Sequence, residues 1–363
     1  MKKIKNNWTD QPAAVRSGEA LDTEKLQTYL QENLPEIQGQ LMLAQFPRGF
    51  SNLTYFLKIG EREFVLRRPP FGTNIKSAHD MPREFNVLSH LAPVYAKAPK
   101  PLLYCDDDRV IGAPFYIMER VEGVILRPNM PVEIYPKPQL MAGIAAAFVD
   151  CFVELHAVDY AAAGLADLGK PSGYIQRQVE GWAKRYIKAK TDDIPEIEYV
   201  ARWLKDHIPA EKQVSLIHND FKYDNIVLDS QDWSQVIAVL DWEMATLGDP
   251  LMDLGTSLAY WLDPDDPPEL RKMQLSPTTI PGNPRRIEIA ERYATLSGQD
   301  ISDIVFYYSY GLFKIAVIIQ QIYARYKKGY TKDKRFAGLI HGVRGCALMA
   351  AQSIKKNRID RLF

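Results

Sequence analysis

One change of pattern along this sequence restricts how the chain can fold. Between residues 41 and 120, apolar residues come in short runs separated by turns, as is typical of antiparallel strands. After residue 123 they recur at helical spacing in long stretches, which only one strand pair, over 225–229 and 236–240, interrupts. The chain is therefore expected to combine a small sheet with a larger helical part, and the polar residues around that strand pair are the first candidates for chemistry.

The expected elements follow from the same patterns. A helix over 22–33 precedes three strands between residues 41 and 68, then a helix over 82–91 and two strands separated by a turn of three aspartates. Long helices are predicted over 139–156, 174–190, 196–207, 285–296, 302–328 and 335–356, and a loop over 263–269. We predict two domains, residues 1–120 with a helical lead over 1–40, and residues 121–363.

Composition excludes several classes of protein. The 45 basic and 45 acidic residues cancel, which removes the overall positive charge of a general nucleic-acid binder. The three cysteines lie far apart without a Cys-x-x-Cys pair, which argues against a zinc module or a disulfide scaffold. No stretch reaches about 18 uninterrupted apolar residues, and the basic start lacks the apolar core of a signal peptide. We expect a cytoplasmic monomer or homodimer that binds neither nucleic acid nor membrane.

Acidic and amide side chains flank the interrupting strand pair. Asp220 precedes its first strand, Asn225 begins that strand and Asp241 follows the second strand, so the hairpin is expected to fold Asp241 back beside the other two. Such oxygen ligands suit Mg²⁺, which usually takes one or two carboxylates together with substrate phosphates. One of the two aspartate carboxylates then remains available to interact with a nucleophile.

The pattern His-x-Asp-x-x-x-x-Asn, a hairpin and a further Asp resembles the catalytic and metal loops of the protein-kinase-like fold. Residues 240–243 and 248–254 make the chain look like the aminoglycoside phosphotransferase and choline kinase-like family. The resemblance covers about residues 40–329. Through residues 114–123 and 313–318 it is especially close to the kinase-like domain fused to some acyl-CoA dehydrogenases. It implies an α+β, bilobal fold: a small N-terminal lobe of antiparallel sheet with a helix, and a larger, mainly helical C-terminal lobe.

The resemblance also implies an enzyme that moves the γ-phosphate of ATP to a hydroxyl group of a small molecule, with ATP and Mg²⁺ as cofactors. Asp220 would accept a hydrogen bond from that hydroxyl, and Asn225 and Asp241 would hold Mg²⁺. Catalysis would then rest mostly on positioning and on neutralising charge.

Other polar residues near this motif are interpreted as structural. His218 would pack and hydrogen-bond the catalytic loop rather than act as a base. Asp249 and Asp253 would cap the following helix or pin that loop rather than bind metal. The sequence departs from the family at Asn219, where a glycine is frequent, and at Glu243, where protein kinases have the glycine of their Asp-Phe-Gly motif.

In the N-terminal lobe, alternation places Val65 and Arg67 on one face of the third strand. Arg67 takes the place of the usual kinase lysine, where it would contact the α- and β-phosphates and pair with Glu84; the alternative is two surface charges. Arg68 points to the other face and is expected to be solvated. The other nucleotide-binding candidates lie in the turn over the phosphates and in the hinge that would read adenine: Gly49, Ser51, Asn52, Met118, Glu119 and Val121.

Two of these assignments have ordinary alternatives. On its local pattern alone, the turn around Gly49 is a hairpin turn with no ligand. Met118 and Val65, which would sandwich the adenine ring, could equally be core residues.

The resemblance leaves the acceptor open. Residues 314–363 hold 12 basic and 2 acidic residues, and a basic wall would attract a CoA thioester and repel a polycationic aminoglycoside. A hydroxyacyl-CoA is therefore the favoured acceptor, and solvated helix faces are the plainer explanation of the charge. The alternatives are an antibiotic kinase for aminoglycosides or macrolides, a sugar or choline kinase, a catalytically inactive nucleotide-binding pseudokinase, and a metal-dependent phosphohydrolase.

Overall fold

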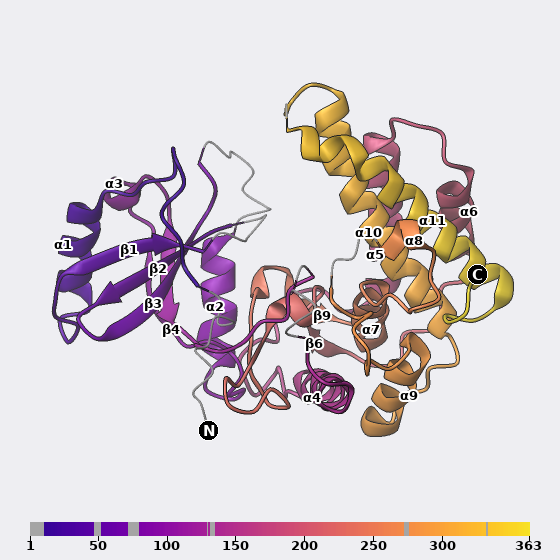
Figure 1. Ribbon diagram of the computed structural model, residues 1–363, viewed down its shortest axis with the longest axis horizontal. Helices are drawn as coiled ribbons and strands as arrows, with labels where there is room; N and C mark the ends of the chain where they lie inside the picture. Colours follow the sequence, from indigo (N-terminus) through magenta and orange to yellow (C-terminus); the bar gives the residue numbers. More distant parts are fainter. Residues whose placement is uncertain are drawn as a thin grey trace. The chain divides into compact units, whose positions relative to one another are not determined.

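Two compact units make up the chain in this computed structural model, which describes residues 11–46, 52–71, 80–128, 130, 135–271, 276–331 and 333–363 (Figure 1). Unit 1 contains residues 1–125, 163–165 and 226–243, and unit 2 contains residues 126–162, 166–225 and 244–363. The chain thus leaves the first unit after residue 125 and later returns to it with the hairpin that interrupts the helical pattern.

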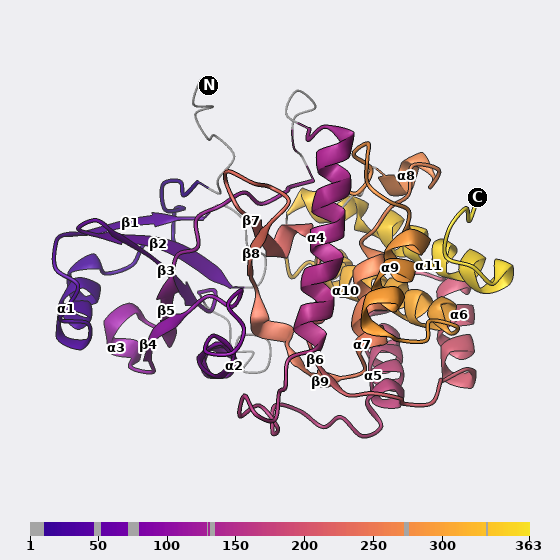
Figure 2. The same cartoon turned by 90° about the horizontal axis from the view of Figure 1, so that it is seen from below.

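An antiparallel sheet in the strand order β1-β2-β3-β5-β4 forms the centre of unit 1. Its strands match the five that the sequence predicts: β1 (Leu41–Gln45), β2 (Leu53–Ile59), β3 (Arg62–Arg68), β4 (Pro101–Cys105) and β5 (Phe115–Glu119). The separate hairpin of β7 (Ile226–Leu228) and β8 (Val236–Val239), labelled in Figure 2, belongs to the same unit. Val124 joins it to the first segment through two backbone hydrogen bonds of 2.8 Å to Leu228.

Alternation sorts the side chains of this sheet onto two faces, as predicted. Helix α1 (Thr23–Asn33) packs on one face, where Phe64 and Leu66 belong to its apolar cluster. The alternate residues of β3, Val65 and Arg67, therefore project from the other face. Helix α2 (Met81–Leu91) packs against β4 and β5 and begins after its N-cap Asp80. A short helix, α3 (Asp108–Ile111), follows β4 where the sequence predicted only a turn.

Arg68 is buried, and the expectation that it is solvated was wrong. Its side chain lies on the face of the sheet that α1 covers. There Nη1 donates to the carbonyl oxygen of Ile111 at 2.8 Å and Nε to that of Pro69 at 3.0 Å. The guanidinium carbon also lies 3.8 Å from the centre of the Phe71 ring. Two carbonyl oxygens and an aromatic face thus replace the water that a buried arginine loses.

Helices dominate unit 2. The long helices predicted from the sequence are all present: α4 (Pro138–His156), α5 (Tyr174–Ala189), α6 (Pro195–Asp206), α9 (Arg286–Ser297), α10 (Ile304–Lys327) and α11 (Leu339–Lys356). The structure adds α7 (Pro250–Ala259), the short α8 (Pro268–Arg271), and an antiparallel pair of β6 (Ser215–Ile217) and β9 (Thr246–Gly248). Helix α10 packs against α5, α6, α7 and α11 and is the central helix of the unit.

Helices α7 and α10 cross with their backbones in contact. A Cβ atom on Gly255 would collide with the carbonyl group of Tyr307, and one on Gly311 with that of Gly255. Both positions therefore need glycine, and this close approach brings the middle of α10 next to the residues that surround α7.

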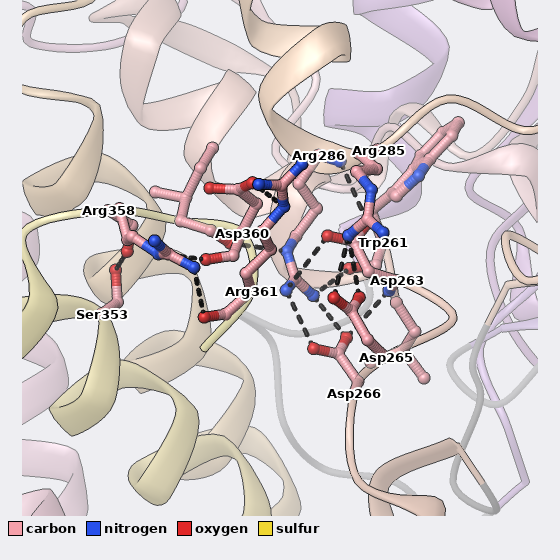
Figure 3. A network of polar contacts seen from close by, with 12 residues as sticks. Trp261, Asp263, Asp265, Asp266, Arg285, Arg286, Ser353, Arg358, Asp360 and Arg361 are labelled. Carbon is pink, nitrogen blue, oxygen red and sulfur yellow. Dashed lines mark hydrogen bonds and ion pairs between the residues drawn. The ribbon is translucent and has the colours of Figure 1, made fainter. Parts of the chain in front are cut away.

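A buried arginine ties three segments of unit 2 together (Figure 3). Arg286 forms ion pairs with Asp266 at 2.5 Å and with Asp263 at 3.4 Å, and it donates to the carbonyl oxygens of Trp261 at 3.0 Å and Ile359 at 2.8 Å. Burial raises the pKa of Asp263 to about 6, although the charge of Arg286 opposes the shift. This network fixes the start of α9 to the loop after α7 and to the segment after α11.

Helices α4 and α10 are long and apolar enough to cross a membrane by length and composition alone. In the most apolar 18 residues of α10, 83% are buried inside the unit, and in those of α4, 44%. Core helices of soluble proteins pass the same test, so these helices are only a weak indication of a membrane protein.

Candidate functional site

Arg67 lies at the centre of a polar cluster on the second face of the unit 1 sheet. Its Nη1 atom lies 3.2 Å from Oε1 of Glu84, and its Nη2 atom lies 2.9 Å from Oδ1 of Asp241 and 3.4 Å from Oε2 of Glu243. Asn52 donates to the same Glu243 oxygen at 2.8 Å. The expected pair of Arg67 with Glu84 is therefore present, and Glu243 joins the cluster as a residue to which the sequence assigned no function.

Burial and neighbouring charges act in opposite directions on the pKa values of this cluster. Glu84 is 1% exposed, and burial raises the pKa of its carboxyl group to about 7 although the charge of Arg67 opposes the shift. Burial also disfavours the charge on Arg67, but the neighbouring anionic groups, above all Glu84, hold the pKa of its guanidinium well above the usual value. A guanidinium can reach two carboxylates at once, which the ammonium group of a lysine does less well. A bound phosphate would compete with Asp241 and Glu243 for the same donors.

Asp241 has a left-handed backbone conformation, with φ at 68°. Aspartate tolerates this region better than most residues, at a cost of about 1 kcal/mol or more. The next residue, Trp242, anchors the turn, because its buried indole donates to the carbonyl oxygen of Val239 at 2.8 Å. The end of β8 is thus held in the form that brings the Asp241 carboxylate to Arg67.

The hinge candidates lie at the end of β5 and just after it. Val65 and Met118 are cross-strand partners in β3 and β5, so their side chains share the face that carries Arg67. The N–H groups of Glu119 and Arg120 both donate to backbone carbonyls, so within the described part of the chain Val121 is the first residue after β5 whose N–H makes no backbone hydrogen bond. The two turn candidates that precede Asn52 lie outside the described residues: Gly49 and Ser51.

Asp220 accepts three side-chain hydrogen bonds in unit 2. Its Oδ2 atom accepts from Lys222 at 2.5 Å and from Asn225 at 2.8 Å, and its Oδ1 atom accepts from the hydroxyl of Tyr260 at 2.7 Å. A carboxylate has about four acceptor positions, so one position on Oδ1 remains open among the residues that the structure describes. Burial alone would raise the pKa of Asp220, but the charge and hydrogen bond of Lys222, with the hydrogen bond of Tyr260, hold it below the usual value. The carboxylate is therefore ionised at neutral pH.

The donor atoms of Asn225 and Asp241 suit Mg²⁺. The amide nitrogen of Asn225 donates at 2.8 Å both to the Oδ2 atom and to the backbone carbonyl oxygen of Asp220, which uses both of its hydrogens and leaves the amide oxygen as a ligand. Asp241 uses Oδ1 for Arg67, while its side chain is 30% exposed and its Oδ2 atom accepts no hydrogen bond from the residues that the structure describes. Both atoms are hard oxygens of the kind that Mg²⁺ prefers.

The loop that carries Asp220 is held from helix α7. Both oxygens of the buried Asp253 carboxylate accept backbone N–H groups, from His218 at 2.6 Å and from Asn219 at 2.7 Å, and Nε2 of His156 lies 3.2 Å from Asp253. Asp249 accepts two backbone N–H groups as the N-cap of α7. The predicted structural roles of Asp249 and Asp253 are therefore confirmed. Within the described ranges, no three His, Cys, Asp or Glu residues form a group that could hold a metal ion.

Asn219 adopts the left-handed conformation that a glycine would take, with φ at 67°. Helix α10 supports it, because Nζ of Lys314 donates to the Asn219 carbonyl oxygen at 2.9 Å and lies 3.2 Å from its side-chain oxygen. Burial lowers the pKa of Lys314 to about 8, although the charges of Asp253 and Asp220 oppose the shift. Lys314 is therefore a buried support of the catalytic loop, and the expectation that it belongs to a basic wall was wrong.

Sequence reasoning missed Lys222 and Tyr260 as neighbours of Asp220. Lys222 stands two residues after Asp220 in the same loop, so this short spacing was a usable signal. Tyr260 is 40 residues away at the end of α7, and no spacing rule connects it to the loop.

Comparison with known proteins gives a consistent result. The profile of the phosphotransferase enzyme family matches residues 43–286. Acyl-CoA dehydrogenase family member 10 of Mus musculus is 37% identical over 315 residues, which are 86% of this chain and 29% of that protein. Acyl-CoA dehydrogenase family member 11 of Homo sapiens is 35% identical over 326 residues, which are 87% of this chain and 41% of that protein. The chain thus spans less than half the length of either relative.

Solved structures share the fold. A Ralstonia eutropha protein solved as a candidate aminoglycoside phosphotransferase is 31% identical, with a TM-score of 0.78 over 93% of this chain and 99% of that one. Choline kinase of Cryptosporidium parvum, at 13% identity, has a TM-score of 0.60 over 94% and 98% of the two chains. An aminoglycoside phosphotransferase solved with ADP and hygromycin B, at 16% identity, has a TM-score of 0.59 over 91% and 98%. The predicted protein-kinase-like fold is confirmed.

Proposed function

Because the chain belongs to the phosphotransferase enzyme family, we propose that it is a small-molecule kinase that transfers the γ-phosphate of ATP to a hydroxyl group. The observation that carries the proposal is the arrangement around Asp220. Three donors hold an ionised carboxylate in place and leave one acceptor position open, which is what a hydroxyl group needs in order to be oriented for attack.

In the proposed reaction, the acceptor hydroxyl donates its hydrogen bond to the open position on Oδ1 of Asp220. Its oxygen forms the new bond to the γ-phosphorus while the bond from that phosphorus to the bridging oxygen breaks, and ADP leaves. The proton passes to Asp220 and then to solvent. Because Lys222 and Tyr260 lower the pKa of Asp220, the carboxylate takes the proton only as the new bond forms.

The nucleotide would bind to unit 1. Arg67, held by Glu84, would contact the α- and β-phosphates, with Asn52 beside them. Val65 and Met118 would enclose the adenine ring. The backbone from Glu119, the last residue of β5, to Val121 would meet the edge of the ring.

Asn225 and Asp241 are the proposed Mg²⁺ ligands. The bound ion would neutralise charge on the transferring phosphates.

A hydroxyacyl-CoA is the acceptor that we favour. The two mammalian relatives are named as acyl-CoA dehydrogenases, and the chain matches 29% and 41% of their lengths. The charge of the C-terminal region supports this choice less than the sequence suggested, since Lys314 is buried and Lys327 pairs with Asp192 at 3.1 Å. Aminoglycosides and choline remain the competing acceptors, because similar structures include proteins named for them.

The test is ADP release from Mg-ATP with 3-hydroxybutyryl-CoA, kanamycin, choline and glucose as separate acceptors. We expect turnover of the hydroxyacyl-CoA and a loss of roughly 10²–10⁴-fold in Asp220→Asn, with unchanged binding of a non-hydrolysable ATP analogue. Asp206→Asn, an exposed carboxylate at the end of α6, is the matched control and should retain full activity. Nucleotide binding without transfer to any acceptor would instead identify a pseudokinase, and turnover of kanamycin alone would reject the proposed acceptor.

A further inference from the structure

Two side chains next to the open position of Asp220 have no assigned part in choosing the acceptor: Lys222 and Tyr260. We propose that they form the wall of the acceptor site nearest the attacking hydroxyl, and that they select an alcohol without a positive charge close to that hydroxyl. This inference rests on the proposed function and narrows its acceptor class.

Hydrogen-bond geometry places Tyr260 beside the acceptor. Its hydroxyl and the attacking hydroxyl would share one oxygen, Oδ1 of Asp220, and the Tyr260 oxygen already lies 2.7 Å from it. Two donors on the same carboxylate oxygen diverge by about 110–120°, so their own oxygens lie about 4.5 Å apart. At that separation the phenol group of Tyr260 contacts the carbon that bears the acceptor hydroxyl.

The position of Tyr260 is well determined by its surroundings. It is the C-cap residue of α7, and the same helix holds the catalytic loop through Asp253. The helix also packs closely on α10 at Gly255, where a larger residue would collide with the neighbouring backbone. Tyr260 and Asp220 are therefore fixed to one rigid support, as a residue that discriminates between acceptors must be.

Lys222 supplies the charge discrimination. Its ammonium lies 2.5 Å from Oδ2 of Asp220 and 4.9 Å from the centre of the Tyr260 ring. The formal charges of Asp220 and Lys222 cancel, so a cationic acceptor gains little attraction from the carboxylate. The aromatic face that would bind such a cation already holds the ammonium of Lys222.

Two other charged groups near Asp220 do not make the site attractive to a cation. Asp253 is buried and accepts two backbone N–H groups, and Lys314 adds a second positive charge behind Asn219. A site with this charge disfavours choline and aminoglycosides and accepts neutral alcohols or hydroxyacyl thioesters.

A matched pair of alcohols tests the inference: choline and 3,3-dimethylbutan-1-ol, which has the same shape without the charge. With Mg-ATP present, we expect the wild type to show at least roughly tenfold higher kcat/KM for the neutral alcohol. In Lys222→Met this ratio should fall by about tenfold, and in Lys222→Arg it should be kept. Tyr260→Phe should change the KM of both alcohols without changing the KM of ATP.

Several outcomes separate this inference from other roles. A Lys222→Met variant that loses activity equally with both alcohols, at an unchanged ratio, would show a purely structural lysine and overturn the inference. A raised KM for ATP in the same variant would assign Lys222 to the nucleotide and overturn it as well. If AMP-PNP fails to bind the wild type, or if no alcohol is phosphorylated, the proposed function itself is wrong and the inference falls with it.

Discussion

Replacement of Arg67 by methionine tests the buried cluster of unit 1 most directly. The change leaves the Glu84 carboxylate, 1% exposed, without the guanidinium that lies 3.2 Å away, and it removes the partner of Asp241. Loss of one partner from a buried ion pair costs about 3–5 kcal/mol of unfolding free energy. We expect a loss of this size at pH 8 in Arg67→Met.

The pH dependence of this loss identifies its cause. In the wild type, burial raises the pKa of Glu84 to about 7, above the ordinary 4.5, so the stability contributed by this group falls as pH rises between these values and is level above 7. Without the charge of Arg67, the pKa of Glu84 moves higher and the fall continues above pH 7. The stability gap between the wild type and Arg67→Met should therefore widen above pH 7, by up to about 1.4 kcal/mol per pH unit.

Urea unfolding at pH 6, 7 and 8, followed by circular dichroism, measures this gap. Arg62→Met is the matched control, because Arg62 is exposed at the start of the same strand, and its change should stay within about 0.5 kcal/mol. A loss below about 1 kcal/mol in Arg67→Met, or a gap that narrows from pH 6 to pH 8, would refute the account of a buried, desolvated pair.

Three further changes test the supports of the catalytic loop. With its pKa lowered to about 8, Lys314 binds fewer protons in the folded state than in the unfolded state, so the wild type should gain stability between about pH 8 and pH 10.5. This gain should disappear in Lys314→Met, and urea unfolding midpoints across this pH range measure it. Asp253→Asn should lower the free energy of unfolding in urea by about 3 kcal/mol, because an amide cannot replace a carboxylate that accepts two backbone N–H groups and lies beside His156. A decrease below about 1 kcal/mol would contradict this. Gly311→Ala should lower the free energy of unfolding by about 2 kcal/mol or more. Gly338→Ala is the control and should cause almost no change, because a Cβ atom there meets no other atom within 4 Å. Equal melting temperatures of the two variants would show that the contact between the helices relaxes freely.

Local pattern was enough to predict most of the fold. The strands of unit 1 and the long helices of unit 2 follow from periods of two and of 3.6 residues, which packing on one face imposes. Helix α7 was missing from the predicted helices, although its N-cap Asp249 was recognised. All ten of its residues are buried, so no alternation between polar and apolar faces marks it.

The candidate site was predictable only where its residues are close in the sequence or share a strand pattern. Asp220 and Asn225 lie in one short loop, and their contact could be expected from five-residue spacing. The contacts of Tyr260 with Asp220 and of Lys314 with Asn219 span 40 and 95 residues, and they depend on how α7 and α10 cross. Such contacts follow from tertiary packing, which a single sequence does not display.

Both errors about charge have one physical cause. Arg68 was expected to be solvated and Lys314 to belong to an exposed basic wall, because charged side chains are usually exposed. Each is instead buried with backbone carbonyl oxygens as partners, at 2.8 Å for Arg68 and 2.9 Å for Lys314. Every residue has a backbone carbonyl group, so residue types do not show which carbonyls will bind a buried cation.

The return of the chain to unit 1 has a consequence for synthesis on the ribosome. Residues 226–243 complete the unit, and until they emerge, Ile125 lacks Val227 and Ala238, its partners in a small apolar cluster. At a synthesis rate of roughly 5–20 residues per second, residues 126–243 take about 6–24 s to synthesise. Ile125 must therefore wait for seconds without its apolar partners, while residues 126–162 and 166–225 of the helical unit have already been synthesised. Premature termination before residue 243 would leave both units incomplete, since neither is a single continuous segment of the chain.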